Sequence, residues 1–253
     1  MLTVSGCGGQ VAPPAPSRHV FVIVMENKSP EEALAGQFTA SLAATYRQAA
    51  NYRAVAHPSV PNYLALTSGS TWGVTDDSYH ALPAQDIGDQ LTKARVSWRA
   101  YMEGLGSDGC LNSPVPYDPG HNPFAYYGGR CPANVVPLTS LAADLTGNTP
   151  LFSWITPDMC HDEHSCNVSV GDDWLRQTVG TITQSKAWTA NGVLFIVWDE
   201  DTAAPATACC HWWSRRIRVI ASATSLTRTT RSWRPSKTCS ALAASDRHPG
   251  RRL

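Results

Sequence analysis

Two almost wholly apolar runs constrain the fold of this 253-residue chain more than any other feature. His19 to Met25 reads HVFVIVM and Val193 to Trp198 reads VLFIVW, and both are rich in β-branched residues. Such runs are typical of strands that are buried on both faces, as in a parallel sheet with helices on each side. We therefore expect polar residues that directly follow these runs to lie at the carboxyl edge of one sheet.

The remaining chain up to Asp201 alternates between expected strands and expected helices. Further strands are expected at Tyr52 to His57, Val96 to Met102 and Leu151 to Ile155. Helices are expected at Phe38 to Ala50, Ser59 to about Leu66, Asp86 to Ala94, Leu138 to Leu145 and Gly171 to Ala187. This alternation predicts a layered α/β fold. Gly104 to Pro137 is rich in Gly, Pro, Asn and Tyr and is too long for a simple connection, so we interpret it as a substrate loop.

Charge divides the chain just after Asp201. Residues 1–201 hold nineteen acidic and ten basic residues, whereas residues 202–253 hold ten basic residues and one acid. The second segment shows neither strand nor helix periodicity, and its Arg, Thr, Ser and Trp content is typical of a GC-rich gene read out of frame. We therefore predict a leader remnant and Pro/Ala linker at 1–17, a catalytic domain at 18–201 and an aberrant tail at 202–253. The alternative is a basic arm for nucleic acid or anionic lipid, but we expect no nucleic-acid partner.

The cysteines and the N-terminus indicate an exported protein. Cys110 with Cys131, and Cys160 with Cys166, would close short loops as disulfides in an oxidising compartment. Val4 to Cys7 resembles a lipoprotein processing box, but the basic and apolar regions of a signal peptide do not precede it. Two explanations stay open, a leader shortened by a misplaced start and a chance match of four residues. No stretch has the roughly 20 apolar residues that span a bilayer. We expect a secreted or cell-envelope protein, with lipid attachment at Cys7 if the true start lies upstream.

Two polar clusters follow the two apolar runs. Glu26 and Asn27 follow the first, and Asp199 and Glu200 follow the second. Carboxylate and amide oxygens are the donors that hard divalent cations prefer. Each pair alone is typical of an ordinary turn, so their coincidence at one sheet edge is what predicts a metal site.

Two further clusters supply a nucleophile and acid–base groups. Ser59 precedes Pro61 at the expected start of a helix, where backbone N–H groups favour a phosphate and a nearby cation would activate the hydroxyl. Ser59 as a simple N-cap is the alternative. The loop Pro157 to Cys166 places His161, Asp162 and His164 directly after a strand, and histidines there can donate to a phosphoryl oxygen or protonate a leaving alkoxide.

The order of these motifs resembles one family. EN, HPSxPNYLALxSG, the P-D-x-C-H-D-x-H-x-C loop, GDxWL and IVWDED, over roughly residues 18–201, are similar to the phosphoesterase family of secreted bacterial acid phosphatases and phospholipases C. The resemblance implies an alkaline-phosphatase-like three-layer sandwich with a mainly parallel central sheet. It implies that Ser59 forms a phosphoseryl intermediate, that His164, His161 and Asp162 serve catalysis, and that His121 and Asn62 contact phosphate. It also implies one divalent metal ion on Glu26, Asn27, Ser59, Asp199 and Glu200.

The sequence departs from this family pattern at several positions. Glu163 and Ser165 stand where the family loop has Gly and Asp, and Gly120 stands where a basic residue often precedes the His121 motif. After Asp201 the family continues with another strand and helix that this chain lacks. We therefore expect weak or absent activity for this exact chain, because a lost core strand leaves a sheet edge uncovered.

Several functional alternatives stay open at this point. The expected activity is hydrolysis of phosphate monoesters on a small phosphorylated substrate or a phospholipid. The alternatives are phospholipase C-type diester cleavage, an inactive family member and a non-catalytic module that binds a metal or an anion. A serine esterase is disfavoured because no Ser lies in a Gly-x-Ser-x-Gly elbow. Hard oxygen ligands favour Ca or Mg, but related folds accept Mn and Zn, so the identity of the metal stays open.

Overall fold

The computed structural model describes residues 18–49 and 52–201, together with the backbone of Ile220–Ala221. The predictions for the leader at 1–17, including Cys7, lie outside the described residues. The predictions for the tail at 202–253 also lie outside them, apart from the backbone of those two residues.

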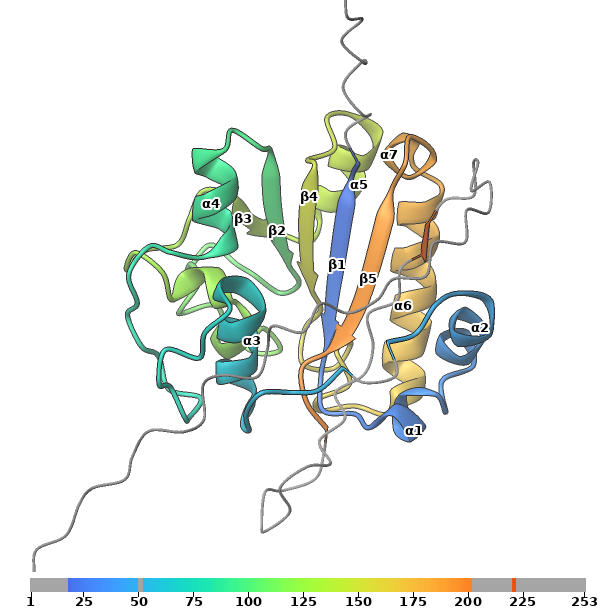
Figure 1. Ribbon diagram of the computed structural model, residues 1–253, viewed down its shortest axis with the longest axis horizontal. Coiled ribbons are helices and arrows are strands. Elements are labelled where there is room, and N and C mark those ends of the chain that lie inside the picture. The colour runs from blue at the N-terminus through green and yellow to red at the C-terminus, as the bar shows by residue number, and fades with distance from the viewer. Residues whose placement is uncertain (1–17, 50–51, 202–219, 222–253) are drawn as a thin grey trace, which may run out of the picture. The chain divides into compact units, whose positions relative to one another are not determined.

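Strands and helices alternate along the described chain (Figure 1). The strands are β1 (Val20–Met25), β2 (Trp98–Met102), β3 (Val135–Pro137), β4 (Phe152–Thr156), β5 (Val193–Trp198) and β6 (Ile220–Ala221). The helices are α1 (Pro30–Ala33), α2 (Gln37–Thr45), α3 (Ser59–Ser68), α4 (Ile87–Lys93), α5 (Ser140–Thr146), α6 (Val168–Thr183) and α7 (Lys186–Thr189), with short 3₁₀ turns at Pro119–His121 and Pro123–Ala125.

The six strands form one sheet in the order β3-β2-β4-β1-β5-β6. The first five strands are parallel, and β6 pairs antiparallel with β5. The two apolar runs are neighbours, since β1 pairs with β5 from Val20 opposite Val193 to Met25 opposite Trp198. The mixed α/β fold with a mainly parallel sheet, predicted from these runs, is confirmed.

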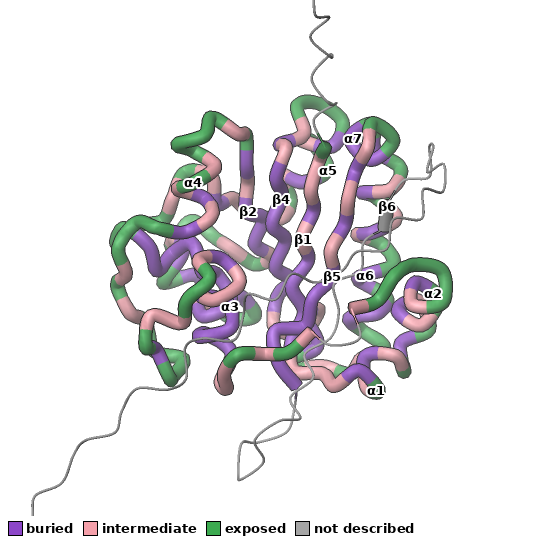
Figure 2. Tube along the Cα trace, in the orientation of Figure 1, coloured by how far each residue is buried: buried purple, intermediate pink, exposed green. Residues whose placement is uncertain are grey.

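Two hydrophobic clusters cover the two faces of the sheet. Phe21, Ile23 and Met25 of β1 pack with side chains of α2, α5, α6 and α7. Val24 of β1 packs on the opposite face with side chains of α3 and of the insertion at 104–137. Figure 2 shows the consequence, since the central strands are buried along most of their length. Burial on both faces explains why these strands read as continuous apolar runs.

Some predicted elements differ from the structure. The strand expected at Tyr52 to His57 is wrong, because the N–H groups of Val55 and Ala56 donate to Oδ1 of Asn62 (both 3.0 Å) and not to a neighbouring strand. The helix expected from Phe38 ends at Thr45. The long helix expected to reach Ala187 ends at Thr183, and Ser185 caps the separate helix α7.

Both predicted disulfides are present, Cys110–Cys131 and Cys160–Cys166. The first closes the insertion at 104–137, and the second closes the loop that follows β4. Among the described residues, no helix combines the length and the apolar character needed to cross a membrane.

Candidate active site

Buried carboxylates gather where β1 and β5 end. Glu26 directly follows β1 and Asp199 directly follows β5, so the pairing of these strands brings the two residues together. The N–H of Asn27 donates to Oδ1 of Asp199 at 3.3 Å. Glu26, Asp199 and Glu200 are each at most 2% exposed. The sheet register thus assembles the carboxylates that the sequence predicted as a metal site.

Ser59 lies between two of these carboxylates. It is the first residue of α3, and its Oγ is 3.0 Å from Oε2 of Glu26 and 3.1 Å from Oε1 of Glu200. Pro58 occupies the N-cap position, and the N–H of Val60 donates to Oδ1 of Asp77 at 3.0 Å. The side chain of Ser59 therefore points at the acidic group and does not cap its own helix.

Burial raises the pKa of all three acids. Desolvation, partly opposed by the charge of His121, raises the pKa of Glu26 to about 7. Desolvation and the charge of Asp199 raise the pKa of Glu200 to about 8, and desolvation with the charge of Glu26 raises that of Asp199 well above its ordinary value. Without a cation, ionising all three acids costs free energy, because they are buried and repel one another.

Unsatisfied oxygens in this acidic group fit a cation. Among the described residues, Oε1 of Glu26 and Oδ2 of Asp199 accept no hydrogen bond, although Nε2 of His121 forms an ion pair with Oε1 of Glu26 at 3.5 Å. Buried oxygens normally have a partner, so these two are well suited to ligate an ion. Hard oxygen donors favour a divalent ion such as Ca²⁺ or Mg²⁺.

His121 forms a buried pair with Asp162. Its Nδ1 is 3.0 Å from Oδ2 of Asp162, its Nε2 is 3.5 Å from Oε1 of Glu26, and its ring stacks on Tyr63 with centroids 5.3 Å apart. Desolvation disfavours the charged ring, but Glu26 and Asp162 outweigh it and raise the pKa of His121 to about 10. In the metal-free protein, these two carboxylates therefore favour the charged form of His121.

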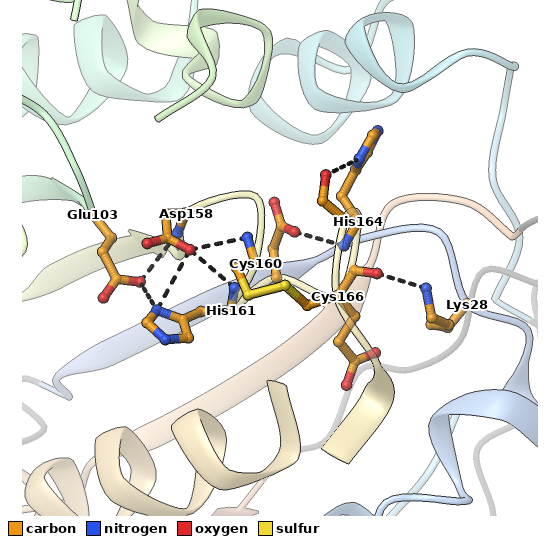
Figure 3. The surroundings of a disulfide bond; sticks show 10 residues. Lys28, Glu103, Asp158, Cys160, His161, His164 and Cys166 are labelled. Carbon is orange, nitrogen blue, oxygen red and sulfur yellow. Dashed lines mark hydrogen bonds and ion pairs between the residues drawn. A yellow bond between two sulfur atoms is a disulfide. The ribbon is translucent and has the colours of Figure 1, made fainter. Parts of the chain in front are cut away.

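The two histidines of the loop after β4 point in opposite directions. His161 points toward Glu103 and Asp158, whereas His164 points away from them on the other side of the Cys160–Cys166 disulfide (Figure 3). The His164 ring is 5.7 Å from that of His121. Desolvation and the charge of His121 lower the pKa of His164, which favours the neutral form of its exposed ring. The structure therefore brings His164, and not His161, toward His121.

Asn62 uses its amide to hold the chain that leads into Ser59. Its Oδ1 accepts from Val55 and Ala56, and its Nδ2 donates to the carbonyl oxygen of Ala56 at 2.9 Å. Nδ2 also lies 3.5 Å from Oε2 of Glu200. Nδ1 of His57 contacts that same oxygen. Asn62, predicted to contact phosphate, thus lies beside the site and fixes the segment before Ser59.

A second group in the described part of the chain has the composition of a metal site. Glu103, Asp158 and His161 each offer one ligand atom, and these atoms lie within 4.8 Å of one another. These side chains already contact one another, since Nδ1 of His161 hydrogen-bonds with Oε2 of Glu103 at 2.9 Å and forms an ion pair with Oδ1 of Asp158 at 3.4 Å.

Comparison with known proteins explains this arrangement. A profile of the phosphoesterase family matches residues 34–207. The chain belongs to the phosphoesterase family. This family member is 32% identical over 195 residues to a phosphatidylinositol-3-phosphatase of Mycobacterium tuberculosis, covering 72% of this chain and 63% of that protein. It is 28% identical over 197 residues to an acid phosphatase of Aspergillus fumigatus, covering 72% of this chain and 44% of that protein.

A further relative and a solved structure agree with this placement. A phosphate-repressible acid phosphatase of Penicillium chrysogenum is 27% identical over 192 residues, covering 70% of this chain and 47% of that protein. The chain spans about half the length of the curated relatives it matches. An alkaline phosphatase superfamily protein from Vibrio parahaemolyticus superposes with a TM-score of 0.56 at 12% identity, covering 81% of this chain and 60% of that one. The chain therefore has the alkaline-phosphatase-like fold that the motifs implied.

Glu163 departs from the family pattern at a position that suits glycine. Its φ is 81°, in the left-handed region that glycine adopts most easily. Its carboxyl group is fully buried, with Oε2 accepting from Nε1 of Trp198 at 3.0 Å. Desolvation raises the pKa of Glu163 to about 7. The Gly expected here is thus explained by backbone conformation.

The GDxWL motif has a structural role that sequence reasoning missed. Oδ1 and Oδ2 of Asp172 accept from the N–H groups of Thr39 and Phe38, at the start of α2. A Cβ on Gly171 would lie 2.3 Å from Cγ of Glu163, so this helix approaches the loop closely. A Gly-Asp pair in a helix was the available signal, since neither residue is a strong helix former.

Proposed function

We propose that this phosphoesterase hydrolyses phosphate monoesters through a phosphorylated Ser59, with a divalent metal ion. The observation that supports this best is the position of Ser59 Oγ, within 3.1 Å of Glu26 and Glu200 in a buried acidic group. The chain spans only part of its curated relatives, so activity, metal dependence and substrate are all part of the proposal.

Glu26, Asn27, Asp199 and Glu200 would hold the metal next to Ser59. A divalent cation there would favour the alkoxide of Ser59 and offset the charge of the phosphoryl group. The ion is Ca²⁺, Mg²⁺, Mn²⁺ or Zn²⁺, with the oxygen donors favouring Ca²⁺ or Mg²⁺. Metal analysis of the purified protein identifies it.

Ser59, His121 and His164 would each carry out one part of the reaction. Ser59 Oγ passes its proton to the Glu200 carboxylate, 3.1 Å away, and attacks phosphorus in line, while the bond to the leaving alkoxide breaks and the alkoxide takes a proton from water. His121, held at Nδ1 by Asp162, donates a hydrogen bond from Nε2 to a phosphoryl oxygen as negative charge shifts there. Water then gives a proton to the ring of His164 and attacks the phosphoserine, the bond from phosphorus to Ser59 Oγ breaks, Oγ takes back the proton from Glu200, and phosphate is released.

The substrate is a small phosphate monoester or the monoester headgroup of a phospholipid. The acid phosphatases among the relatives favour the first, and the phosphatidylinositol-3-phosphatase favours the second. Phospholipase C-type diester cleavage is the alternative. The insertion at 104–137, which contributes His121, would select among these substrates.

We also propose a secreted or cell-envelope location. Two disulfides in the described chain fit an oxidising compartment. Attachment through Cys7 would require a start upstream of the given one. Fractionation of the source cells into envelope, medium and cytoplasm tests the location.

The tail remains part of the proposal as an out-of-frame segment. Its composition changes after Asp201, and the family profile ends close by, at residue 207. On this hypothesis the chain works weakly or not at all. A gene sequence with stop codons in the alternative frame of this region would contradict it.

The experiment that tests the function compares three substrates on the metal-loaded protein. p-Nitrophenyl phosphate, phosphatidylinositol 3-phosphate and phosphatidylcholine represent a small monoester, a lipid monoester and a diester. We expect release of phosphate from the first two, abolished by Ser59→Ala and unaffected by Ser41→Ala, an exposed serine on α2. Cleavage of phosphatidylcholine alone, or full activity in Ser59→Ala, would overturn the proposal, and metal binding without any turnover would indicate an inactive family member.

A further inference from the structure

Three side chains fasten the loop that follows β4. We call Glu103, Asp158 and His161 the loop anchor. Glu103 directly follows β2, and its N–H donates to the carbonyl oxygen of Thr156 at 3.0 Å, which places it beside the end of β4. Its Oε2 accepts from the N–H of Asp158 at 3.1 Å and faces Nδ1 of His161 at 2.9 Å.

Hydrogen bonds within the loop and a ring contact with α6 also hold the loop anchor in place. Oδ1 of Asp158 accepts from the N–H groups of Cys160 and His161, both at 3.0 Å. The His161 ring stacks on Trp174 of α6, with centroids 6.3 Å apart and 23° between the ring planes. One carboxylate oxygen of Glu103 thus fixes both the backbone at Asp158 and the ring of His161 (Figure 3).

The anchored loop holds Asp162 at the centre of the site. The N–H of Asp162 donates to the carbonyl oxygen of Asp158 at 2.8 Å, so its position follows directly from the anchor. The carbonyl oxygen of Asp162 accepts from the N–H of Glu26 at 2.9 Å. Its two carboxylate oxygens bind the ring of His121 and the N–H of His164, at 3.0 Å and 2.7 Å.

We propose that Glu103 is a positioning residue of this hydrolase and that His161 acts as part of the loop anchor, not as an acid–base group. The inference rests on the proposed function and assigns Glu103 a role in it. Groups in an active site must be held within a fraction of an ångström, so a loop that shifts at Asp158 would displace Asp162 and its partners. A cation at the anchor is not needed, because Oε2 of Glu103 and Oδ1 of Asp158 already accept from backbone N–H groups and Nδ1 of His161 already hydrogen-bonds with Glu103.

Two pairs of variants separate anchoring from chemistry. Glu103→Gln keeps an oxygen that accepts both N–H groups, whereas Glu103→Ala removes it. His161→Asn keeps an N–H close to the position of Nδ1, whereas His161→Ala does not. Glu31→Gln, on the exposed surface of α1, is the control for loss of a carboxylate.

Each variant is measured in the full chain, after its cooperative unfolding has been verified. The readouts are hydrogen exchange of the peptide spanning residues 157–166, and kcat and KM for p-nitrophenyl phosphate. We expect both alanine variants to exchange at least about tenfold faster in this peptide and to lose about tenfold or more in kcat at similar KM. Glu103→Gln and His161→Asn should stay within about threefold of the parent protein in both.

The result that overturns the inference is specific to the anchor. If His161→Asn loses as much kcat as His161→Ala while exchange stays at the parent rate, His161 acts through its imidazole. If Glu103→Ala leaves exchange unchanged, Glu103 does not hold the loop. The exchange comparison needs no turnover. An inactive parent protein or a fully active Ser59→Ala variant would therefore contradict the proposed function, whereas the exchange rates would still show whether Glu103 and His161 hold the loop.

Discussion

Removal of metal should make the stability of this protein fall as the pH rises from 5 to 8. A carboxyl group whose pKa is higher in the folded state contributes stability that is fully present below its unfolded pKa and is lost as the pH rises through its folded pKa. Burial raises the pKa of Glu26 from 4.5 to about 7 and that of Glu200 from 4.5 to about 8. Both groups therefore destabilise the metal-free fold at neutral pH.

The magnitude follows from the shift at Glu26. A rise from 4.5 to about 7 is 2.5 pKa units, and integrating over pH 5 to 8 gives a loss of roughly 2 to 3 kcal/mol from this fully buried group. A divalent ion at a hundred times its Kd would raise the free energy of unfolding by about 2.7 kcal/mol at pH 8. It would return less at pH 5, where protons compete for the same oxygens.

Urea unfolding at pH 5, 6.5 and 8, with chelator or with excess metal ion, measures this effect. Glu26→Gln removes the titrating group and should flatten the pH dependence of the chelated protein by a similar amount. A chelated parent protein with stability that is constant or rises toward pH 8 would refute the reasoning. A metal ion that gives no more stabilisation at pH 8 than at pH 5 would do the same.

Two substitutions in α6 test how this helix supports the site. Asp172→Ala leaves the N–H groups of Phe38 and Thr39 without their acceptor and should cost about 2 kcal/mol in urea unfolding; an equal cost for Asp173→Ala, on the exposed face, would argue against a specific cap. Gly171→Ala would place a Cβ 2.3 Å from Cγ of Glu163 and 2.9 Å from the carbonyl oxygen of His161, and should cost about 1 to 3 kcal/mol. Gly180→Ala, where the nearest atom is 4.0 Å away, should instead stabilise by about 0.5 to 1 kcal/mol, and the same sign for both glycines would contradict the packing explanation.

The sheet could be predicted because its signal is local. Burial of β1 and β5 on both faces requires apolar side chains at nearly every position, and that requirement is visible in the sequence. The strand predicted at Tyr52 to His57 was wrong because the N–H groups of Val55 and Ala56 donate to the side chain of Asn62 in the next turn of chain, a contact that the apolar content of the segment does not reveal.

The site could be predicted only in part. The ends of β1 and β5 and the start of α3 brought Glu26, Glu200 and Ser59 together as expected, because paired strands end at one edge of the sheet. His161 and His164 could not be distinguished by composition. Their directions depend on the loop conformation, including the left-handed Glu163 and the Cys160–Cys166 disulfide. Glu103 was missed because a single acid after a strand looks like a turn residue.

The most direct test of the central claim is a search for phosphate covalently bound to Ser59. The metal-loaded protein is mixed with excess p-nitrophenyl phosphate, quenched in acid and mapped by peptide mass spectrometry. We predict one phosphoryl group on the peptide that contains Ser59, even where turnover is slow, because a single transfer is sufficient for detection. Release of p-nitrophenol with no label on Ser59, or with the label on another residue, would contradict the account.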